Sequence, residues 1–136
     1  MKREILFRGK RVDTGEWVYG LLIESKNGEC HILVKNYNPI KKQGSGHWYI
    51  DAPCFQVHPD TVCQFTGLLD KNGNKIFEGD KLRLENLWSN TEWETFVRFD
   101  NGTMVVDIEE CDYNMTSIGF IDEETEIEIT GNIHDK

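Results

Sequence analysis

The sequence repeatedly places a short alternating run, an Asn-Gly pair and a second alternating run in succession. "EWVYGLLIE" at positions 16–24 is followed by the turn residues "KNGE" and then by "CHILVK" at 30–35. One face of the first run holds Trp17, Tyr19, Leu21 and Ile23, and the other holds Val18 and Leu22. An Asn-Gly pair between two such runs is the strongest short-range signal of a β-hairpin. We therefore expect a hairpin here, with apolar residues on both faces of its first strand.

The same pattern recurs toward the C-terminus. "WETFVRF" places Trp93, Thr95, Val97 and Phe99 on one face, "DNG" turns the chain, and "TMVVDI" returns. "TEIEITGNI" then alternates isoleucine with glutamate, as in a half-buried strand whose outer face is acidic. The expected fold is mainly β, with antiparallel strands and hairpins forming a small barrel or packed sheets. At most one or two short helical turns are expected, in "HPDTV" or around 122–125.

The chain length and the hydropathy pattern bound the organisation of the molecule. The chain has 136 residues, which suits one domain, so a single domain is predicted over residues 1–136. "NYNPIKKQGSGHWYIDAPC" is rich in Gly, Pro and Asn and has no periodicity, which predicts a long loop at about 36–54. No apolar run approaches the ~20 residues that span a bilayer, and "ILF" near the N-terminus is too short for a signal-peptide core. We expect a cytoplasmic protein that does not associate with a membrane.

Negative charge is concentrated near the C-terminus. The chain carries a formal charge of −9, and residues 99–135 hold eleven acidic residues and no lysine or arginine. Such a surface repels nucleic-acid phosphate and attracts basic partners. Two interpretations follow: solvated outer strand faces that maintain solubility, or an acidic surface that binds a basic target, including one that mimics DNA.

One segment resembles the start of a calcium-binding loop. In "GLLDKNGNKIFEGDKL", the potential oxygen ligands Asp70, Asn72 and Asn74 stand two positions apart. Counted from Asp70, however, a calcium loop needs glycine at its sixth position and glutamate at its twelfth, where this chain has Lys75 and Lys81. The segment is better interpreted as a hairpin turn at Asn72-Gly73, with Glu78-Gly79-Asp80 marking entry into the next strand.

Thiol and imidazole groups offer one alternative site. Cys54, His58 and Cys63 fall close together in the sequence and could form the centre of a metal-binding protein or an enzyme. Their spacing does not match the close ligand pairs that are usual for zinc, and the chain has no C-x-x-C pair. The four cysteines are therefore expected to be reduced and mostly buried. No catalytic, cofactor-binding or metal-ligating residue is predicted, and no cofactor is expected.

A second alternative is a small nucleic-acid-binding barrel. Its basic N-terminal segment would supply Lys2, Arg3, Arg8, Lys10 and Arg11. Exposed aromatic side chains such as Trp17 or Trp48 would stack with bases, as in oligonucleotide-binding barrels. The pI of 4.9 and the acidic C-terminal part argue against nucleic acid, and pairing between the basic start and the acidic end accounts for both charges.

Three segments together resemble the YopX family of phage and prophage proteins. "FRGKRVDTGEWVYGLL" matches the family opening at Phe7, Arg8, Gly9, Gly15, Trp17, Val18 and Gly20. "VHPDTVCQFTGLLDKNGNKIFEGD" matches the central pattern, and "EIEITGNIHD" fits the terminal strand at Gly131, Asn132 and Ile133. The resemblance implies a mainly β fold and an origin in a bacteriophage or a prophage, with a Gram-positive bacterium as host. It supplies no catalytic or binding residue.

The leading hypothesis is a non-enzymatic phage accessory protein of the host bacterial cytoplasm. It would act as a macromolecular interaction module whose acidic C-terminal surface contacts a protein of phage or host, plausibly a basic one. Homo-oligomerisation is expected as well.

Overall fold

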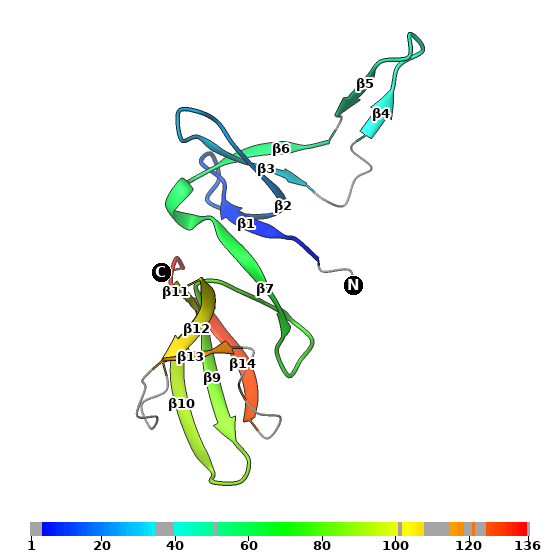
Figure 1. The fold of residues 1–136 in the computed structure, drawn as a ribbon. Helices are drawn as coiled ribbons and strands as arrows, with labels where there is room; N and C mark the ends of the chain where they lie inside the picture. Colours follow the sequence, from blue (N-terminus) through cyan, green and yellow to red (C-terminus); the bar gives the residue numbers. More distant parts are fainter. Residues whose placement is uncertain are drawn as a thin grey trace. The chain divides into compact units, whose positions relative to one another are not determined.

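The computed structural model describes residues 4–34, 40–50, 52–100, 102–107, 115–118, 121 and 125–135. The chain divides into two compact units, Met1–Gln64 and Phe65–Lys136, and each is described by itself. Almost all regular structure in both units is antiparallel β, as predicted (Figure 1). The prediction of a single domain over residues 1–136 stays a prediction.

The first unit is built on one antiparallel sheet with the order β6-β3-β2-β1. Its strands are β1 (Phe7–Lys10), β2 (Trp17–Glu24), β3 (Cys30–Val34) and β6 (Cys54–Val57). Strand β7 (Cys63–Leu69) pairs its first two residues with β1 and then continues into the second unit. Cys30, Ile32 and Val57 form the core of the first unit, with Val18 and Leu22 of β2 packed against them. The predicted face of Val18 and Leu22 is therefore the inner face of the sheet.

The predicted β2–β3 hairpin is confirmed. Its turn places Gly28 at φ 84°, a left-handed conformation that glycine adopts without steric cost. The opposite face of β2 also carries apolar residues but is not covered, because Tyr19, Leu21 and Ile23 are all exposed. Period-2 alternation places side chains on one of two faces, but only the tertiary packing decides whether a face is covered.

Part of the stretch predicted as a long loop at 36–54 forms a hairpin instead. Strands β4 (Ile40–Lys42) and β5 (Trp48–Ile50) pair antiparallel as a separate two-stranded sheet. Its turn is closed by backbone bonds from the Gln43 N–H to the His47 carbonyl and from the Gly46 N–H to the Gln43 carbonyl. Three-residue strands are too short to show period-2 alternation, which is why the sequence pattern was interpreted as a loop.

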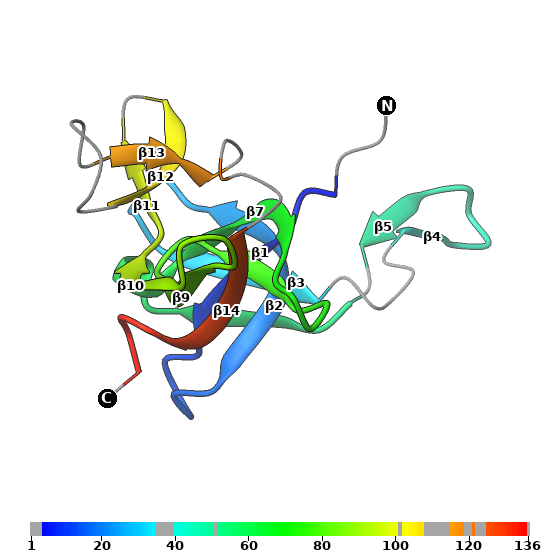
Figure 2. The same ribbon diagram turned by 90° about the horizontal axis from the view of Figure 1, so that it is seen from below.

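The second unit contains two three-stranded sheets packed around one core. One sheet has the order β10-β9-β14 and the other β11-β12-β13 (Figures 1 and 2). Their six strands are β9 (Asp80–Asn86), β10 (Thr91–Phe96), β11 (Arg98–Asp100), β12 (Thr103–Asp107), β13 (Met115–Ser117) and β14 (Thr125–Asn132), and β8 (Lys75–Phe77) pairs with β7 instead. Leu82 and Leu84 of the first sheet pack with Val106 of the second. In the part of the chain that the structure describes, each sheet ends on two different edge strands, so the packed-sheet alternative holds over the barrel.

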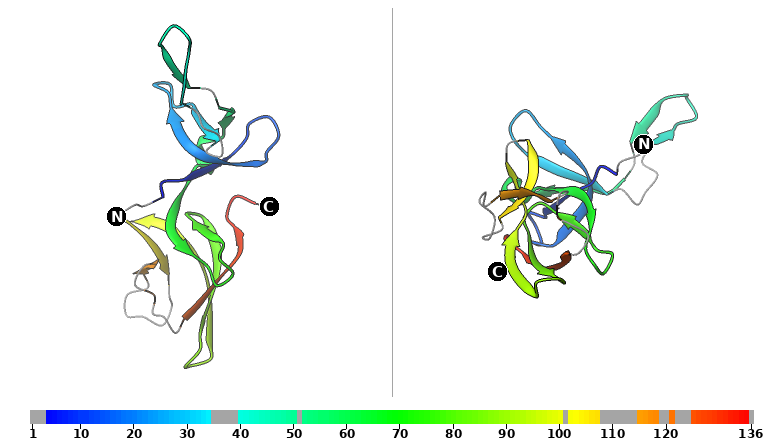
Figure 3. Two further views of the ribbon diagram at one scale, coloured as in Figure 1. Left: turned by 90° about the vertical axis from the view of Figure 1, so that its right-hand side faces the viewer. Right: turned by 60° about the horizontal axis from the view of Figure 1, so that its bottom comes forward.

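Strands β9 and β10 form a long hairpin whose turn spans residues 87–90 (Figure 3). Strand β14 pairs with the other edge of β9, from Thr125 opposite Asn86 to Asn132 opposite Asp80. The N-terminal and C-terminal parts of this unit are thereby joined, since β9 and β14 are far apart in the sequence.

The predicted turn after His58 is helical. Residues Pro59–Thr61 form the 3-10 helix η1, with proline in its first turn, where its missing N–H costs nothing. The second candidate turn, around 122–125, lies largely outside the described residues. Over the described residues, the structure contains no helix of the length and hydrophobicity that crossing a bilayer requires.

Candidate functional site

The calcium-like segment is a hairpin turn, as the sequence indicated. Oδ1 of Asp70 accepts the N–H groups of Asn72 and Asn74, each at 2.9 Å, and Oδ2 accepts the Ile129 N–H at 3.2 Å. Gly73 has φ 82°, and Leu69 pairs with Lys75 across the turn. Burial acts to raise the pKa of the Asp70 carboxyl, but these N–H donors stabilise the carboxylate more, so its pKa lies below the ordinary value. Both oxygens of the carboxylate therefore accept backbone N–H groups and stabilise the turn.

The "EGD" run starts strand β9, again as predicted. Gly79 has φ 85°, its N–H bonds to the Val97 carbonyl at 2.8 Å, and its own carbonyl accepts the Ile133 N–H at 2.8 Å. Asp80 is 2% exposed, and its Oδ2 accepts the Phe77 N–H at 2.8 Å. This turn, like the one before it, is architectural.

Arg8 and Lys10 of β1 and the adjacent Arg11 cover aromatic rings of their own unit. The Arg8 guanidinium lies 4.6 Å and the Lys10 ammonium 5.3 Å from the centroid of Trp17, while Arg11 lies 4.1 Å from that of Phe55. Arg8 is only 5% exposed. Trp17, the first proposed stacking platform for bases, is thus already engaged by two cations. Lys2 and Arg3 of the predicted basic segment lie outside the described residues.

A shallow pocket of about 280 Å³ lies beside this cluster, lined by Val12, Asp13, Cys54, Phe55 and Gln56. The Arg11 side chain pairs with Asp13 in a two-bonded geometry, at 2.9 and 2.7 Å. The hydrogen bonds to Arg11 lower the pKa of the Asp13 carboxyl below its ordinary value. The Arg11–Asp13 ion pair and the Phe55 ring therefore lie at one edge of the pocket. Arg11 already interacts with both Asp13 and Phe55.

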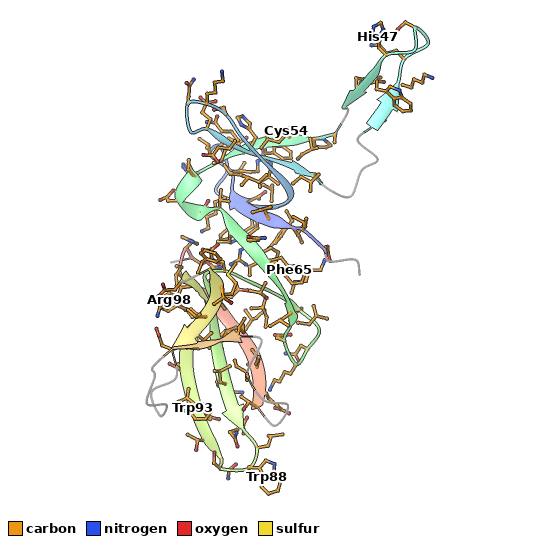
Figure 4. The ribbon with its side chains drawn as sticks, in the orientation of Figure 1. His47, Cys54, Phe65, Trp88, Trp93 and Arg98 are labelled. Atoms are coloured by element: carbon orange, nitrogen blue, oxygen red, sulfur yellow. The ribbon has the colours of Figure 1, made fainter. Side chains whose placement is uncertain are left out.

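The structure does not assemble the alternative centre of Cys54, His58 and Cys63. Cys54 is exposed on β6 (Figure 4), whereas Cys63 is 1% exposed and directs its thiol to the Thr61 carbonyl at 3.2 Å. Within the described ranges, no three His, Cys, Asp or Glu side chains are grouped as metal ligands. Burial raises the pKa of the Cys30 thiol. Two of the three described cysteines, Cys30 and Cys63, are buried, as expected of mostly buried thiols, and Cys111 lies outside the described residues.

The β4–β5 hairpin places a lysine opposite each of two exposed aromatic residues. Lys42 pairs across the strands with Trp48, and Lys41 pairs with Tyr49. The Lys42 ammonium lies 5.5 Å from the centroid of Trp48. His47 lies in the turn (Figure 4), where its Nδ1 is 3.0 Å from the Ser45 hydroxyl. The sequence indicated Trp48 but not its lysine partners; the available signal was the lack of any acidic residue between Glu29 and Asp51.

The described carboxylates of the acidic C-terminal part have partners within their own unit. Arg98 binds Asp100 at 2.6 Å and Asp107 at 3.0 Å. Lys71 binds Glu128 at 2.8 Å, and this contact is the main cause that lowers the pKa of the Glu128 carboxyl. The other acidic residues of this part, Glu109, Glu110, Asp112, Asp122, Glu123 and Glu124, lie outside the described residues. The outer face of β14 therefore carries a network of ion pairs, in which Lys71 and Arg83 contact Glu128.

The protein thus belongs to the class of small proteins built from antiparallel β-sheets. Its surface carries ion pairs and exposed aromatic side chains. The chain belongs to the YopX family: residues 6–136 match the family described as YopX protein. The resemblance carried by the opening, central and terminal motifs is thereby confirmed.

The solved structures include a similar fold, the crystal structure of protein YopX from Bacillus subtilis. The two chains align with a TM-score of 0.57 and 16% sequence identity, over 94% of this chain and 91% of that one. At this identity the likeness establishes the shared fold. No curated protein matches the sequence.

Proposed function

We propose that this chain is a non-enzymatic phage or prophage accessory protein of the host bacterial cytoplasm, which binds a protein with a basic surface. Membership of the YopX family supports the phage-type assignment. The observation that carries the proposal is the unequal charge of the two compact units. Met1–Gln64 contains nine basic and seven acidic residues, whereas Phe65–Lys136 contains six basic and 17 acidic residues, for a net charge of −11.

The net negative charge of the second unit attracts cations over a longer distance than its internal ion pairs span. Pairs such as Arg98 with Asp107 rearrange charge locally but leave the excess of carboxylates unchanged. At physiological ionic strength that excess attracts a basic surface over about 8 Å, and the attraction weakens as salt is added. A basic protein fits this field, whereas nucleic-acid phosphate is repelled by it.

Charge reversal with quantitative affinity capture tests the proposal. The tagged full chain is used to capture proteins from a lysate of the bacterial host, and each captured protein is quantified by mass spectrometry. We expect Glu109→Lys with Glu110→Lys to remove basic proteins that the unaltered chain retains at low salt. Glu24→Lys with Glu29→Lys makes the same charge change in the first unit and should leave those proteins bound. Equal capture by the unaltered chain and both double variants would refute the proposal.

Self-association is part of the same proposal, and the exposed face of β2 supports it. Tyr19, Leu21 and Ile23 are 45%, 38% and 45% exposed and form an apolar stripe that a second copy would cover. Light scattering of the unaltered chain should give a mass above 15.8 kDa. Leu21→Glu should lower that mass, whereas Leu69→Glu, at an exposed site on β7, should not. A monomeric mass for the unaltered chain would exclude self-association.

A further inference from the structure

The β4–β5 hairpin carries two Lys–aromatic pairs, one on each of its faces. In an antiparallel ladder, residues directly opposite each other project from the same face, while neighbours along a strand project from opposite faces. The register pairs Lys42 with Trp48 and Lys41 with Tyr49, so one pair lies on each face. The two aromatic rings are therefore displayed back to back, each beside a cation.

Both rings are available to solvent. Trp48 is 66% exposed and Tyr49 is 41% exposed, which is unusual for large aromatic side chains in a folded unit. Trp17, by contrast, is only partly exposed and has two cations over its ring, whereas the exposed Trp48 has one, Lys42 at 5.5 Å. Trp48 and Tyr49 are not part of the core of the first unit, which is formed by Cys30, Ile32 and Val57.

The local charge around the hairpin is opposite to that of the whole chain. The chain has a formal charge of −9, yet no aspartate or glutamate occurs between Glu29 and Asp51. Within 40–50, Lys41 and Lys42 are the cationic groups. An anionic ligand therefore meets an attractive surface here although the protein as a whole repels it.

We infer that the β4–β5 hairpin binds single-stranded nucleic acid. Unpaired bases stack on exposed aromatic rings such as Trp48 and Tyr49, and the adjacent lysines neutralise the phosphates between those bases. A duplex keeps its bases stacked on each other and offers the rings no free base. An acidic peptide would use the lysines but would leave both rings without a stacking partner. This surface belongs to the first unit and does not depend on the acidic surface proposed above for the second.

Fluorescence anisotropy of a labelled oligothymidine of about 12 nucleotides, titrated with the full chain at low salt, tests the inference. We expect Trp48→Ala to weaken binding by roughly 5- to 150-fold, the range for loss of one stacked base. Trp48→Phe retains a ring and should retain most of the affinity. Trp88→Ala is the matched control, because Trp88 is 79% exposed in the turn between β9 and β10 of the acidic unit (Figure 4).

Salt dependence tests the role of the lysines. Lys41→Gln with Lys42→Gln should reduce the slope of log affinity against log salt by about 1.4, since each phosphate contact to a single strand contributes about 0.7. Lys26→Gln, in the exposed turn between β2 and β3, should leave the slope unchanged. Circular dichroism of each variant confirms that the β structure is retained.

Three results would overturn the inference. The first is no binding by the unaltered chain at low salt, and the second is equal affinity for Trp48→Ala and Trp88→Ala. The third is displacement of the oligonucleotide by polyglutamate or by duplex DNA at the same concentration as by unlabelled oligothymidine. Glu109→Lys with Glu110→Lys should not abolish oligonucleotide binding, so failure of this inference and failure of the proposed protein partner are separately recognisable.

Discussion

Gly9 lies directly against the side chain of Val57. A Cβ atom at position 9 would be 2.8 Å from Cγ2 and 2.9 Å from Cβ of Val57, closer than real Cβ contacts allow. Gly9→Ala should therefore lower the free energy of unfolding by about 1–3 kcal/mol, as overpacking does. Denaturant titration measures the change. Gly44→Ala introduces the same methyl group where no atom lies within 4 Å and should change stability by less than about 0.5 kcal/mol. Equal stability of the two variants would contradict the close packing.

The carboxylate of Asp70 should make stability depend on pH. Its pKa is lower in the folded chain than the value of about 3.9 for an unfolded aspartate, so its contribution is complete above about pH 4. The contribution is lost as the pH falls through the folded pKa. Asp70→Asn should lower the free energy of unfolding by about 1–3 kcal/mol at neutral pH, because at least one N–H loses its charged acceptor. The two stability curves should converge below about pH 4, and parallel curves would be inconsistent with this account.

Gly79 should not tolerate a side chain, for a conformational reason. Its φ of 85° lies in the left-handed region, and both its N–H and its carbonyl are fixed by bonds to Val97 and Ile133. Gly79→Ala should cost about 1–2 kcal/mol of unfolding free energy, the penalty for an L-residue in that region. Gly131→Ala in β14 of the same unit meets no atom within 4 Å and serves as the control. Thermal unfolding followed by circular dichroism would show whether only the first variant melts earlier.

Cys54 should be the fastest-reacting thiol among the described cysteines. It is exposed, whereas Cys30 and Cys63 are buried, and burial raises the pKa of the Cys30 thiol further. Because the thiolate is the reactive form, a thiol reagent at pH 8 should show one fast phase and slow phases limited by opening of the fold. The rates should be measured with Cys111→Ser present, and adding Cys54→Ser should remove the fast phase. A fast phase that survives both substitutions would show that a buried thiol is accessible.

Local turn chemistry made much of the fold predictable from the sequence. The glycines of the three Asn-Gly pairs, Gly28, Gly73 and Gly102, all adopt positive φ at the turns that the sequence indicates. Phe99 is an exception, because the alternation places it on one face with Val97, yet Val97 is buried and Phe99 is 58% exposed. Strand β10 ends at Phe96 and β11 begins at Arg98, so the alternation shifts by one residue. A shift of this kind in the alternation depends on which strands are paired, and the tertiary structure decides that pairing.

The candidate surfaces were predictable only in part, for the same reason. Glu128 was expected on a solvated acidic face, but Lys71, which is distant in the sequence, binds it at 2.8 Å. The register of the β4–β5 hairpin pairs Lys42 with Trp48, and neither three-residue strand shows enough alternation to predict it. Residue types and local charge were visible in the sequence, whereas their neighbours across strands were not.

The position of strand β7 limits where recombination can divide this chain. The boundary between the two compact units falls between Gln64 and Phe65, inside the continuous strand Cys63–Leu69. Domain boundaries that recombination exchanges usually fall in exposed linkers, where few contacts are lost. A crossover at this boundary would separate Cys63, paired with Arg8, from Phe65, paired with Phe77, within one strand. The two halves should therefore pass between genomes together, and fusion partners should be attached at the chain ends.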